Sequence, residues 1–217
     1  MEENETTIIN PVTVSIEDIE NFVIEAGSDH VQTFGGKFEG GSQIQQIADE
    51  IAPCIHAILE SGHPIKAYLE IGACAGGTVF LMNQFLKPEK IVLIDNNRHP
   101  KHHIRPYILT DIEHIEIIGD SHAQGTIDAL KLTDIIFDCI LVDGDHSYPG
   151  CKMDVDIYRE FLNDGGFIIL HDSQLKECGV KQVVEEMKAD EGFEFIGEYL
   201  SEKHTHVLGV ALFRKVD

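Results

Sequence analysis

Five short apolar segments between residues 67 and 172 constrain the fold of this chain more than any other feature of its sequence. Each is almost continuously hydrophobic, as strands of a parallel sheet are when both of their faces are buried. The segments are residues 67–71, 90–95, 115–118, 137–143 and 166–172. Helical stretches lie between most of them, for example around 79–86 and 153–162. This alternation predicts βαβ units, and therefore a parallel sheet with right-handed crossovers.

Two further strands are expected at the end of the chain. The segments "FEFIGEYL" (193–200) and "HVLGVALF" (206–213) are joined by the polar "SEKHT", so they should pair antiparallel. The predicted fold class is therefore α/β. It is a three-layer α/β/α sandwich around a seven-stranded, mostly parallel sheet with an antiparallel C-terminal hairpin.

Two helices are expected before the first strand. Apolar residues at helical spacing follow Ser15 and end before Gly27, which predicts a capped helix. A second apolar stripe predicts a helix over residues 42–61.

A glycine-rich segment, residues 27–41, separates the two predicted helices. Its glycines, with Phe34 and Phe38, suit a lid that closes over a substrate, and they suit a plain connector equally well. We therefore divide the chain into residues 1–41, with the first helix and the possible lid, and residues 42–217, one large domain.

The charge of the chain excludes several partners. The net charge of −22, from 16 basic and 38 acidic residues, would repel nucleic acid and anionic membranes. No apolar run approaches the ~18 residues of a membrane span, and the acidic N-terminus is unlike a signal peptide, so a cytoplasmic location is expected. The sequence leaves open whether the chain forms a homo-oligomer.

The cysteines indicate neither disulfides nor a zinc knuckle. They are odd in number, scattered and without C-x-x-C spacing, so we expect reduced thiols, mostly in the core. They are Cys54, Cys74, Cys139, Cys151 and Cys178.

The segment "YLEIGACAGGTVF" is the first with a chemical signature. A strand ends in Glu70 and passes through Gly72, Gly76 and Gly77 into a helix, as in loops that bind a nucleoside cofactor. A plain strand-to-helix turn is the alternative. Cys74 stands where a dinucleotide loop would have its second glycine against a pyrophosphate, which favours a nucleoside without phosphates.

The next two strands also end in carboxylates. Asp95 closes the second strand, where a carboxylate can accept hydrogen bonds from both ribose hydroxyls. Asp120 and Ser121 follow the third strand, where an adenine edge could be recognised. Ordinary turns are the alternative explanation at both places.

These motifs, in this order and spacing, resemble class I S-adenosylmethionine-dependent methyltransferases. More narrowly, "VDGDHSY" and the later "GGFIILHDS" resemble the metal-dependent O-methyltransferases of antibiotic-sugar and cephalosporin-hydroxylase-like type. The resemblance covers roughly residues 40–217. It implies a Rossmann-like fold and methyl transfer from S-adenosylmethionine to a hydroxyl of a small molecule, such as a sugar or another secondary metabolite.

The resemblance also implies roles for individual residues. Those implied to hold the cofactor are Glu70, Gly72, Ala73 and Gly76 for its methionine part, Asp95 and Asn96 for the ribose, and Asp120 and Ser121 for adenine. Those implied to bind a divalent cation are Asp143, His171 and Asp172. The family usually has two acidic groups at the last two positions, so His171 is a departure.

Elementary electrostatics supports a cation site independently of the family. Neighbouring parallel strands lie about 4.8 Å apart, so Asp143 and Asp172 should meet beyond their carboxyl ends. Two like charges there raise one pKa unless a cation compensates them. Two carboxylates suit Mg²⁺ or Ca²⁺, whereas an imidazole ligand such as His171 favours Mn²⁺, Fe²⁺ or Zn²⁺. The resemblance places Mg²⁺ first, and the ligand chemistry places Mn²⁺ second. The alternative to a cation site is that Asp143 and Asp172 are polar residues at two separate loop ends.

The catalytic base is expected beside the cation. His146 lies three residues after Asp143 and has an ordinary pKa near the working pH. Asp143 itself is the second candidate. A loop histidine bonded to a neighbour is an equal alternative for His146.

Two other classes of function stay open. His146, His171 and Asp172 match the two-His-one-carboxylate set of non-haem iron oxygenases, although the usual β-sandwich frame of those enzymes lacks this βαβ alternation. A non-catalytic module that keeps the nucleoside pocket is the other.

Overall fold

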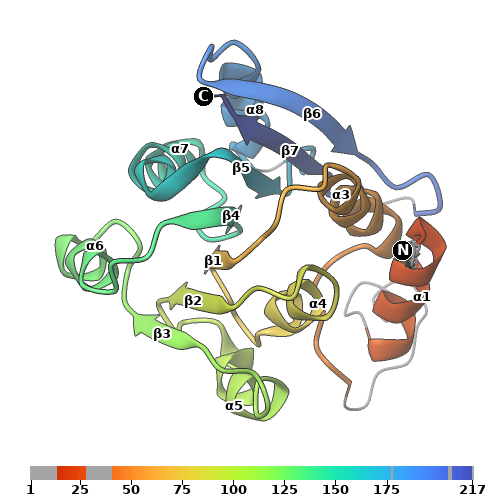
Figure 1. Ribbon diagram of the computed structural model, residues 1–217, viewed down its shortest axis with the longest axis horizontal. Coiled ribbons are helices and arrows are strands. Elements are labelled where there is room, and N and C mark those ends of the chain that lie inside the picture. Colours follow the sequence, from red (N-terminus) through yellow and green to blue (C-terminus); the bar gives the residue numbers. More distant parts are fainter. Residues whose placement is uncertain (1–13, 28–40, 177, 205–206, 217) are drawn as a thin grey trace, which may run out of the picture.

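A seven-stranded sheet runs through the centre of the protein (Figure 1). It is seen in a computed structural model that describes residues 14–27, 41–176, 178–204 and 207–216. The strand order is β3-β2-β1-β4-β5-β7-β6; β1 to β5 are parallel, and β7 runs antiparallel to both of its neighbours. The predicted fold class is confirmed.

The strand boundaries differ from the prediction mainly in the last three strands. The strands are β1 (Ala67–Ile71), β2 (Lys90–Asp95), β3 (Ile115–Ile118), β4 (Phe137–Val142), β5 (Leu162–His171), β6 (Phe193–Tyr199) and β7 (Val210–Lys215). β5 begins earlier than expected because Leu162 still pairs with Phe137 across a register shift. β7 begins later because the N–H groups of Leu208 and Gly209 donate to the carboxylate of Glu50.

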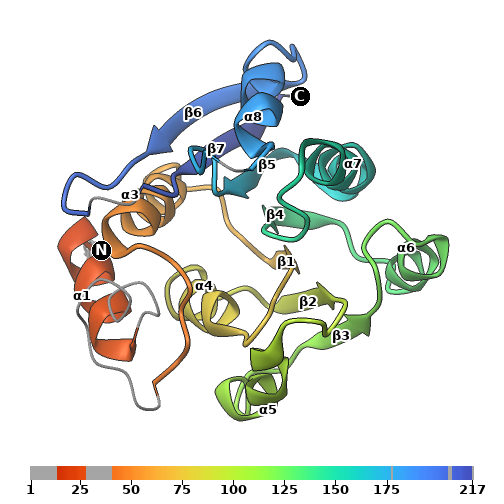
Figure 2. The ribbon, with the colours of Figure 1, turned by 180° about the vertical axis from the view of Figure 1, so that it is seen from behind.

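Helices cover both faces of the sheet (Figures 1 and 2). They are α1 (Ile16–Ala26), α3 (Ala48–Glu60), α4 (Gly77–Leu86), α5 (Arg105–Ile108), α6 (Gln124–Lys131), α7 (Tyr148–Tyr158) and α8 (Val180–Lys188), with short 3₁₀ helices at Pro100–Ile104 and Arg159–Phe161. Side chains of α1, α3 and α4 fill one hydrophobic core, and those of α6, α7 and α8 fill the other. None of the helices in the described part of the chain is both long and apolar enough to cross a membrane.

Helix α1 has the predicted ends. The Ser15 side chain and the Asp18 backbone and side chain form a reciprocal capping box, and Gly27 ends the helix at a φ of 88°. The glycine-rich segment 27–41, interpreted above as either a lid or a connector, falls largely outside the described residues.

The second predicted helix is shorter than expected. The sequence predicts a helix over residues 42–61, whereas α3 begins at Ala48 and Ile47 has extended backbone angles. The preceding residues pack against the start of α4, where a Cβ on Gly77 would overlap the backbone of Gln43. The apolar stripe extends beyond the helix because Ile44 and Ile47, which belong to this crossing segment, are themselves buried.

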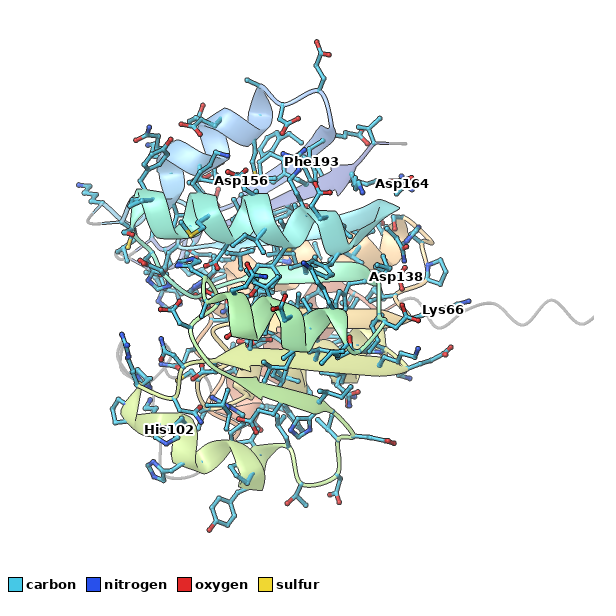
Figure 3. All side chains as sticks on the ribbon, turned by 90° about the vertical axis from the view of Figure 1, so that its left-hand side faces the viewer. Lys66, His102, Asp138, Asp156, Asp164 and Phe193 are labelled. Carbon is cyan, nitrogen blue, oxygen red and sulfur yellow. The ribbon has the colours of Figure 1, made fainter. Side chains whose placement is uncertain are left out.

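The amino ends and the carboxyl ends of the central strands differ in structure. The amino ends of β1 and β4 are joined by Asp138, which is buried and accepts hydrogen bonds from the N–H groups of Lys66 and Ala67. Figure 3 shows Lys66 and Asp138 on the side of the molecule opposite to His102. At the carboxyl ends of the strands, the connection from β1 leads to β2 on one side of the sheet, and the connection from β4 leads to β5 on the other side. The topological switch point therefore lies between β1 and β4, and ligands of such sheets bind at this point.

Candidate functional site

A cavity of about 660 Å³ opens at the carboxyl ends of the parallel strands. This volume lies within the roughly 300–1,000 Å³ of small-molecule sites. The predicted site residues that line it are Gly72, Asp95, Asn96, Asp120, Ser121, Asp143, His146, His171 and Asp172. Those that do not line it are Glu70, Ala73 and Gly76. Nine of the twelve predicted site residues therefore line one cavity, and the other three are buried, each within two positions of a residue that lines it.

Gly72 is required where the loop after β1 meets the loop after β4. Its φ is 90°, and a Cβ there would overlap the backbone carbonyl of Asp143. The N–H of Asp143 in turn donates to the carbonyl of Ile71 at 2.9 Å. The glycine thus allows the loop after β1 to pack directly on the backbone of Asp143, the first residue after β4.

Glu70 lies inside the sheet, with 1% of its surface exposed. The Tyr68 hydroxyl donates to its Oε2 at 2.6 Å. Burial, only partly opposed by this hydrogen bond, raises the pKa of Glu70 to about 8. The predicted contact of Glu70 with a cofactor stays a prediction.

Asp95 accepts hydrogen bonds from the loop after β1 and from the turn that follows β2. The N–H of Cys74 donates to Oδ2 at 2.7 Å, and the N–H of Asn97 donates to Oδ1 at 2.6 Å. A carboxylate has about four acceptor positions, so these two bonds leave about two for a ligand, as many as the two predicted ribose contacts require.

Arg105 is a site residue that the sequence does not reveal. It stands in the basic segment 98–106, yet only 2% of its surface is exposed. Its Nε donates to the Cys74 carbonyl at 2.8 Å, and its Nη2 lies 3.2 Å from Asp95 Oδ1. Nη1 pairs with Glu116 on β3. The guanidinium therefore joins the loop after β1 to β2 and β3.

On the other side of the cavity, Asp120 and Ser121 follow β3. The Asp120 side chain is 58% exposed, and the Ser121 carbonyl accepts from Tyr158 at 2.7 Å. The neighbouring His122 also lines the cavity, and its Nε2 lies 3.0 Å from the fully buried Asp154. Asp154 is not predicted from the sequence because it stands within α7, remote from His122 along the chain.

Four side chains form a compact acid–imidazole cluster, which comprises Asp143, His146, His171 and Asp172. The Asp143 Oδ1 lies 3.0 Å from His171 Nδ1 and 3.2 Å from His146 Nε2. The other ring nitrogen of His146 lies 3.1 Å from Asp172 Oδ2. The predicted meeting of Asp143 and Asp172 thus occurs, and two imidazoles lie against the two carboxylates.

The charges of this cluster shift each other's protonation. Burial alone would raise the pKa of Asp143, but the imidazoles of His171 and His146 outweigh it and hold that pKa well below its usual range. Burial opposes protonation of His171, but the Asp143 carboxylate outweighs it and raises the pKa of His171 to about 9. The hydrogen bond to Asp143 raises the pKa of His146.

The metal-free protein should lose stability in alkaline solution because of His171. Its folded pKa of about 9 exceeds its ordinary 6.5, so its contribution is complete below pH 6.5 and disappears as the pH rises through about 9. The loss is at most about 3 kcal/mol. The free energy of unfolding of the wild type and of His171→Asn, measured with denaturant between pH 6 and pH 10, checks this expectation. This pH range includes both the ordinary and the folded pKa of His171. Equal slopes for both proteins would contradict the assignment.

Two buried polar residues that interact with members of the cluster are also absent from the sequence prediction. Gln46 is fully buried and donates from Nε2 to Asp143 Oδ2 at 3.3 Å. Glu50, also fully buried, accepts from the N–H groups of Ser201, Leu208 and Gly209. A carboxylate on the apolar stripe of a helix is a usable signal for Glu50, whereas the contact of Gln46 spans 97 residues and leaves no local pattern.

Comparisons with known proteins agree with this geometry. Residues 69–173 match the sequence model of a family described as "Methyltransferase domain". A curated relative, the uncharacterized protein R132 of Acanthamoeba polyphaga mimivirus, is 28% identical over 115 residues. That match covers 49% of this chain and 51% of the relative, so the chain spans about half of the relative's length.

Solved structures of methyltransferases share the fold. The O-methyltransferase TomG of Streptomyces achromogenes, involved in tomaymycin synthesis and solved with S-adenosylmethionine, has a TM-score of 0.59 at 15% identity and covers 95% of this chain and 93% of its own. A Bacillus cereus O-methyltransferase with S-adenosylhomocysteine has 0.58 at 14%, covering 73% and 78%. The N-methyltransferase NodS of Bradyrhizobium japonicum, also with S-adenosylhomocysteine, has 0.59 at 15%, covering 76% and 85%.

These matches fall on the elements that form the cavity. The family match begins in β1 and ends just after Asp172, so it includes the glycine loop, Asp95 and the whole acid–imidazole cluster. The β-sandwich frame expected of an iron oxygenase is not the one found here. Residues 69–173 therefore resemble a methyltransferase domain, and the chain has the Rossmann-like fold that these solved methyltransferases share.

Proposed function

We propose that this protein transfers the methyl group of S-adenosylmethionine to a hydroxyl of a small molecule with the help of a divalent cation. The observation that carries the proposal is the juxtaposition of two groups of residues in one cavity. The acid–imidazole cluster occupies one part of the lining, and Gly72, Asp95 and Asp120 line another. A cofactor and a cation-activated acceptor could therefore meet there.

The donor set of the cluster fits a hard or borderline divalent cation. Donor atoms of Asp143, His171 and Asp172 lie within 4.8 Å of one another. The His171 Nδ1 lies 3.0 Å from Asp143 and 3.5 Å from Asp172. Adjacent ligands of an octahedral ion at 2.0–2.1 Å are about 3 Å apart, so small side-chain shifts suffice. We place Mg²⁺ first and Mn²⁺ second, since one of the three donors is an imidazole.

The chain's own residues would bind and orient the reactants. The polar groups that line the cavity would hold the nucleoside cofactor through Gly72, Asp95, Asn96, Asp120 and Ser121. When bound, S-adenosylmethionine supplies an electrophilic methyl group. A divalent cation supplies Lewis acidity that lowers the pKa of a nearby hydroxyl.

The proton of the acceptor hydroxyl would pass to His146 or to Asp143. Both side chains line the cavity, and their contact at 3.2 Å would share the proton between them. They differ in pH behaviour. Asp143 stays ionised because its pKa is held low, whereas His146, with its raised pKa, must first lose a proton. A base role for His146 therefore predicts a rate that increases with pH.

A sugar or another secondary metabolite is the proposed acceptor. The resemblance to antibiotic-sugar methyltransferases supports it, and TomG, a structural neighbour, is involved in tomaymycin synthesis. NodS, with a similar fold, is an N-methyltransferase, so the fold alone leaves the acceptor atom open.

Removal of the cation should abolish methyl transfer. After treatment with a chelator, transfer of labelled methyl from S-adenosylmethionine to a panel of sugars and phenols should fall to background. Mg²⁺ or Mn²⁺ should restore it, because the Asp143 site then regains its Lewis acid. Full transfer in the presence of chelator would contradict metal assistance, and transfer to amines alone would contradict the hydroxyl acceptor.

A further inference from the structure

Cys178 brings a thiol to the edge of the acid–imidazole cluster. Donor atoms of His146, Asp172 and Cys178 lie within 4.8 Å of one another. This set shares only Asp172 with the three residues proposed above for Mg²⁺ or Mn²⁺. Asp172 is 4% exposed and Cys178 is half-buried, so the group is partly shielded from solvent.

Backbone hydrogen bonds hold the thiol beside His146. The N–H of Leu175 donates to the Asp172 carbonyl at 3.2 Å, and the N–H of Cys178 donates to the Leu175 carbonyl at 3.0 Å. The next residue, Gly179, donates its N–H to the His146 carbonyl at 2.8 Å. The first two bonds fold the loop after β5 on itself, and the third fastens it to the loop after β4 next to the thiol.

The His146 ring is oriented as a metal ligand would be. Its Nε2 lies 3.2 Å from the Asp143 carboxylate, to which an N–H can donate. That tautomer leaves the lone pair of Nδ1 directed toward Asp172, 3.1 Å away. A carboxylate that fixes the far nitrogen of a ligating histidine is a recurrent feature of protein metal sites.

We propose that His146, Asp172 and Cys178 form a second cation site, selective for a thiophilic divalent ion and suited to Zn²⁺. Thiolate and imidazole ligands favour Zn²⁺ over Mg²⁺, which prefers oxygen. Neighbouring ligands of a tetrahedral zinc ion lie about 3.3–3.7 Å apart, close to the 3.1 Å between His146 and Asp172. A rotation of the Cys178 side chain covers the remaining distance, about 1 Å.

The shared aspartate couples the two sites. Zn²⁺ on this second set would engage Asp172 and His146, so it should inhibit methyl transfer supported by Mg²⁺. The inhibition rests on the proposed function, whereas the binding of Zn²⁺ through a thiolate does not.

Cobalt spectroscopy tests the binding directly. The reduced full-length chain, titrated with Co²⁺, should develop a thiolate-to-cobalt charge-transfer band that saturates at one equivalent. Zn²⁺ should displace it and Mg²⁺ should not. Cys178→Ser should abolish the band and weaken Zn²⁺ binding at least about tenfold. His146→Asn, which keeps the thiol, should weaken Co²⁺ binding by a similar factor.

A second thiol of the cavity provides the matched control. Cys74 is also half-buried and also contacts a histidine, with its Sγ 2.9 Å from His99 Nδ1. Cys74→Ser should keep the cobalt band. A band that is absent from the wild type, that survives in Cys178→Ser, or that disappears in Cys74→Ser would overturn the proposal. The band needs no methyl acceptor, so its failure is distinguishable from failure of the proposed function, which appears as absent methyl transfer.

Discussion

Asp143→Asn should abolish methyl transfer while leaving the affinity for S-adenosylmethionine nearly unchanged. The substitution removes a carboxylate that contacts both His146 and His171, and with it a charge that the divalent cation requires. Lewis-acid assistance is worth several kcal/mol, so we expect kcat to fall by about 10²–10³. Turnover with labelled cofactor and calorimetric binding of S-adenosylhomocysteine give the two readouts.

Asp145→Asn is the matched control, two residues away in the same loop. Asp145 is exposed and its Oδ1 accepts from the N–H of Ser147 at 2.9 Å, a bond that an asparagine oxygen can also accept. Its kcat should stay close to that of the wild type. If Asp143→Asn instead keeps its turnover, Asp143 has no catalytic role, and a binding module without turnover would leave nothing for either variant to lose.

Arg105→Met should cause a large loss of stability. It removes a buried guanidinium and leaves the Asp95 carboxylate, 8% exposed, without its cationic partner. Breaking a buried ion pair in this way costs about 3–5 kcal/mol. Cofactor binding should weaken as well, since Arg105 also holds the carbonyl of Cys74. Denaturant unfolding measures the first effect and calorimetry the second.

The controls separate charge from packing. Arg98→Met removes an exposed arginine seven residues earlier and should change stability by no more than about 0.5 kcal/mol. Arg105→Lys should recover little, because an ammonium cannot bridge three partners as a guanidinium fork does. Asp95→Asn combined with Arg105→Met should be less destabilising than the sum of both. Strict additivity would mean that the pair is not coupled.

The sheet is well predicted from the sequence because its signal is local. Strands β2 to β5 each end in a carboxylate or lead to one within two residues, and the parallel arrangement alone brings the carboxyl ends of these strands to one end of the sheet. For this reason the strand pattern is enough to assign Asp95, Asp120, Asp143 and Asp172 to one cavity, which all four of them line.

The features that escape prediction from the sequence depend on contacts between distant segments. Arg105 stands among histidines and a lysine that remain at least partly exposed, and nothing in that run marks it as the one cation that is buried. The start of α3 is misplaced by the sequence pattern because the crossing segment keeps a helical apolar spacing while it packs on Gly77. The loop after β5 likewise brings Cys178 next to His146, a neighbour 32 residues earlier in the chain.

Calorimetric titration with S-adenosylmethionine and S-adenosylhomocysteine, each with and without Mg²⁺ or Mn²⁺, tests the central claim most directly. We predict saturable binding of both at one site per chain, because the cavity and its polar lining already exist in the protein alone. The cation should change the cofactor affinity little, since the cation ligands and the proposed cofactor ligands are different residues. Failure of both compounds to bind at millimolar concentration would contradict the account.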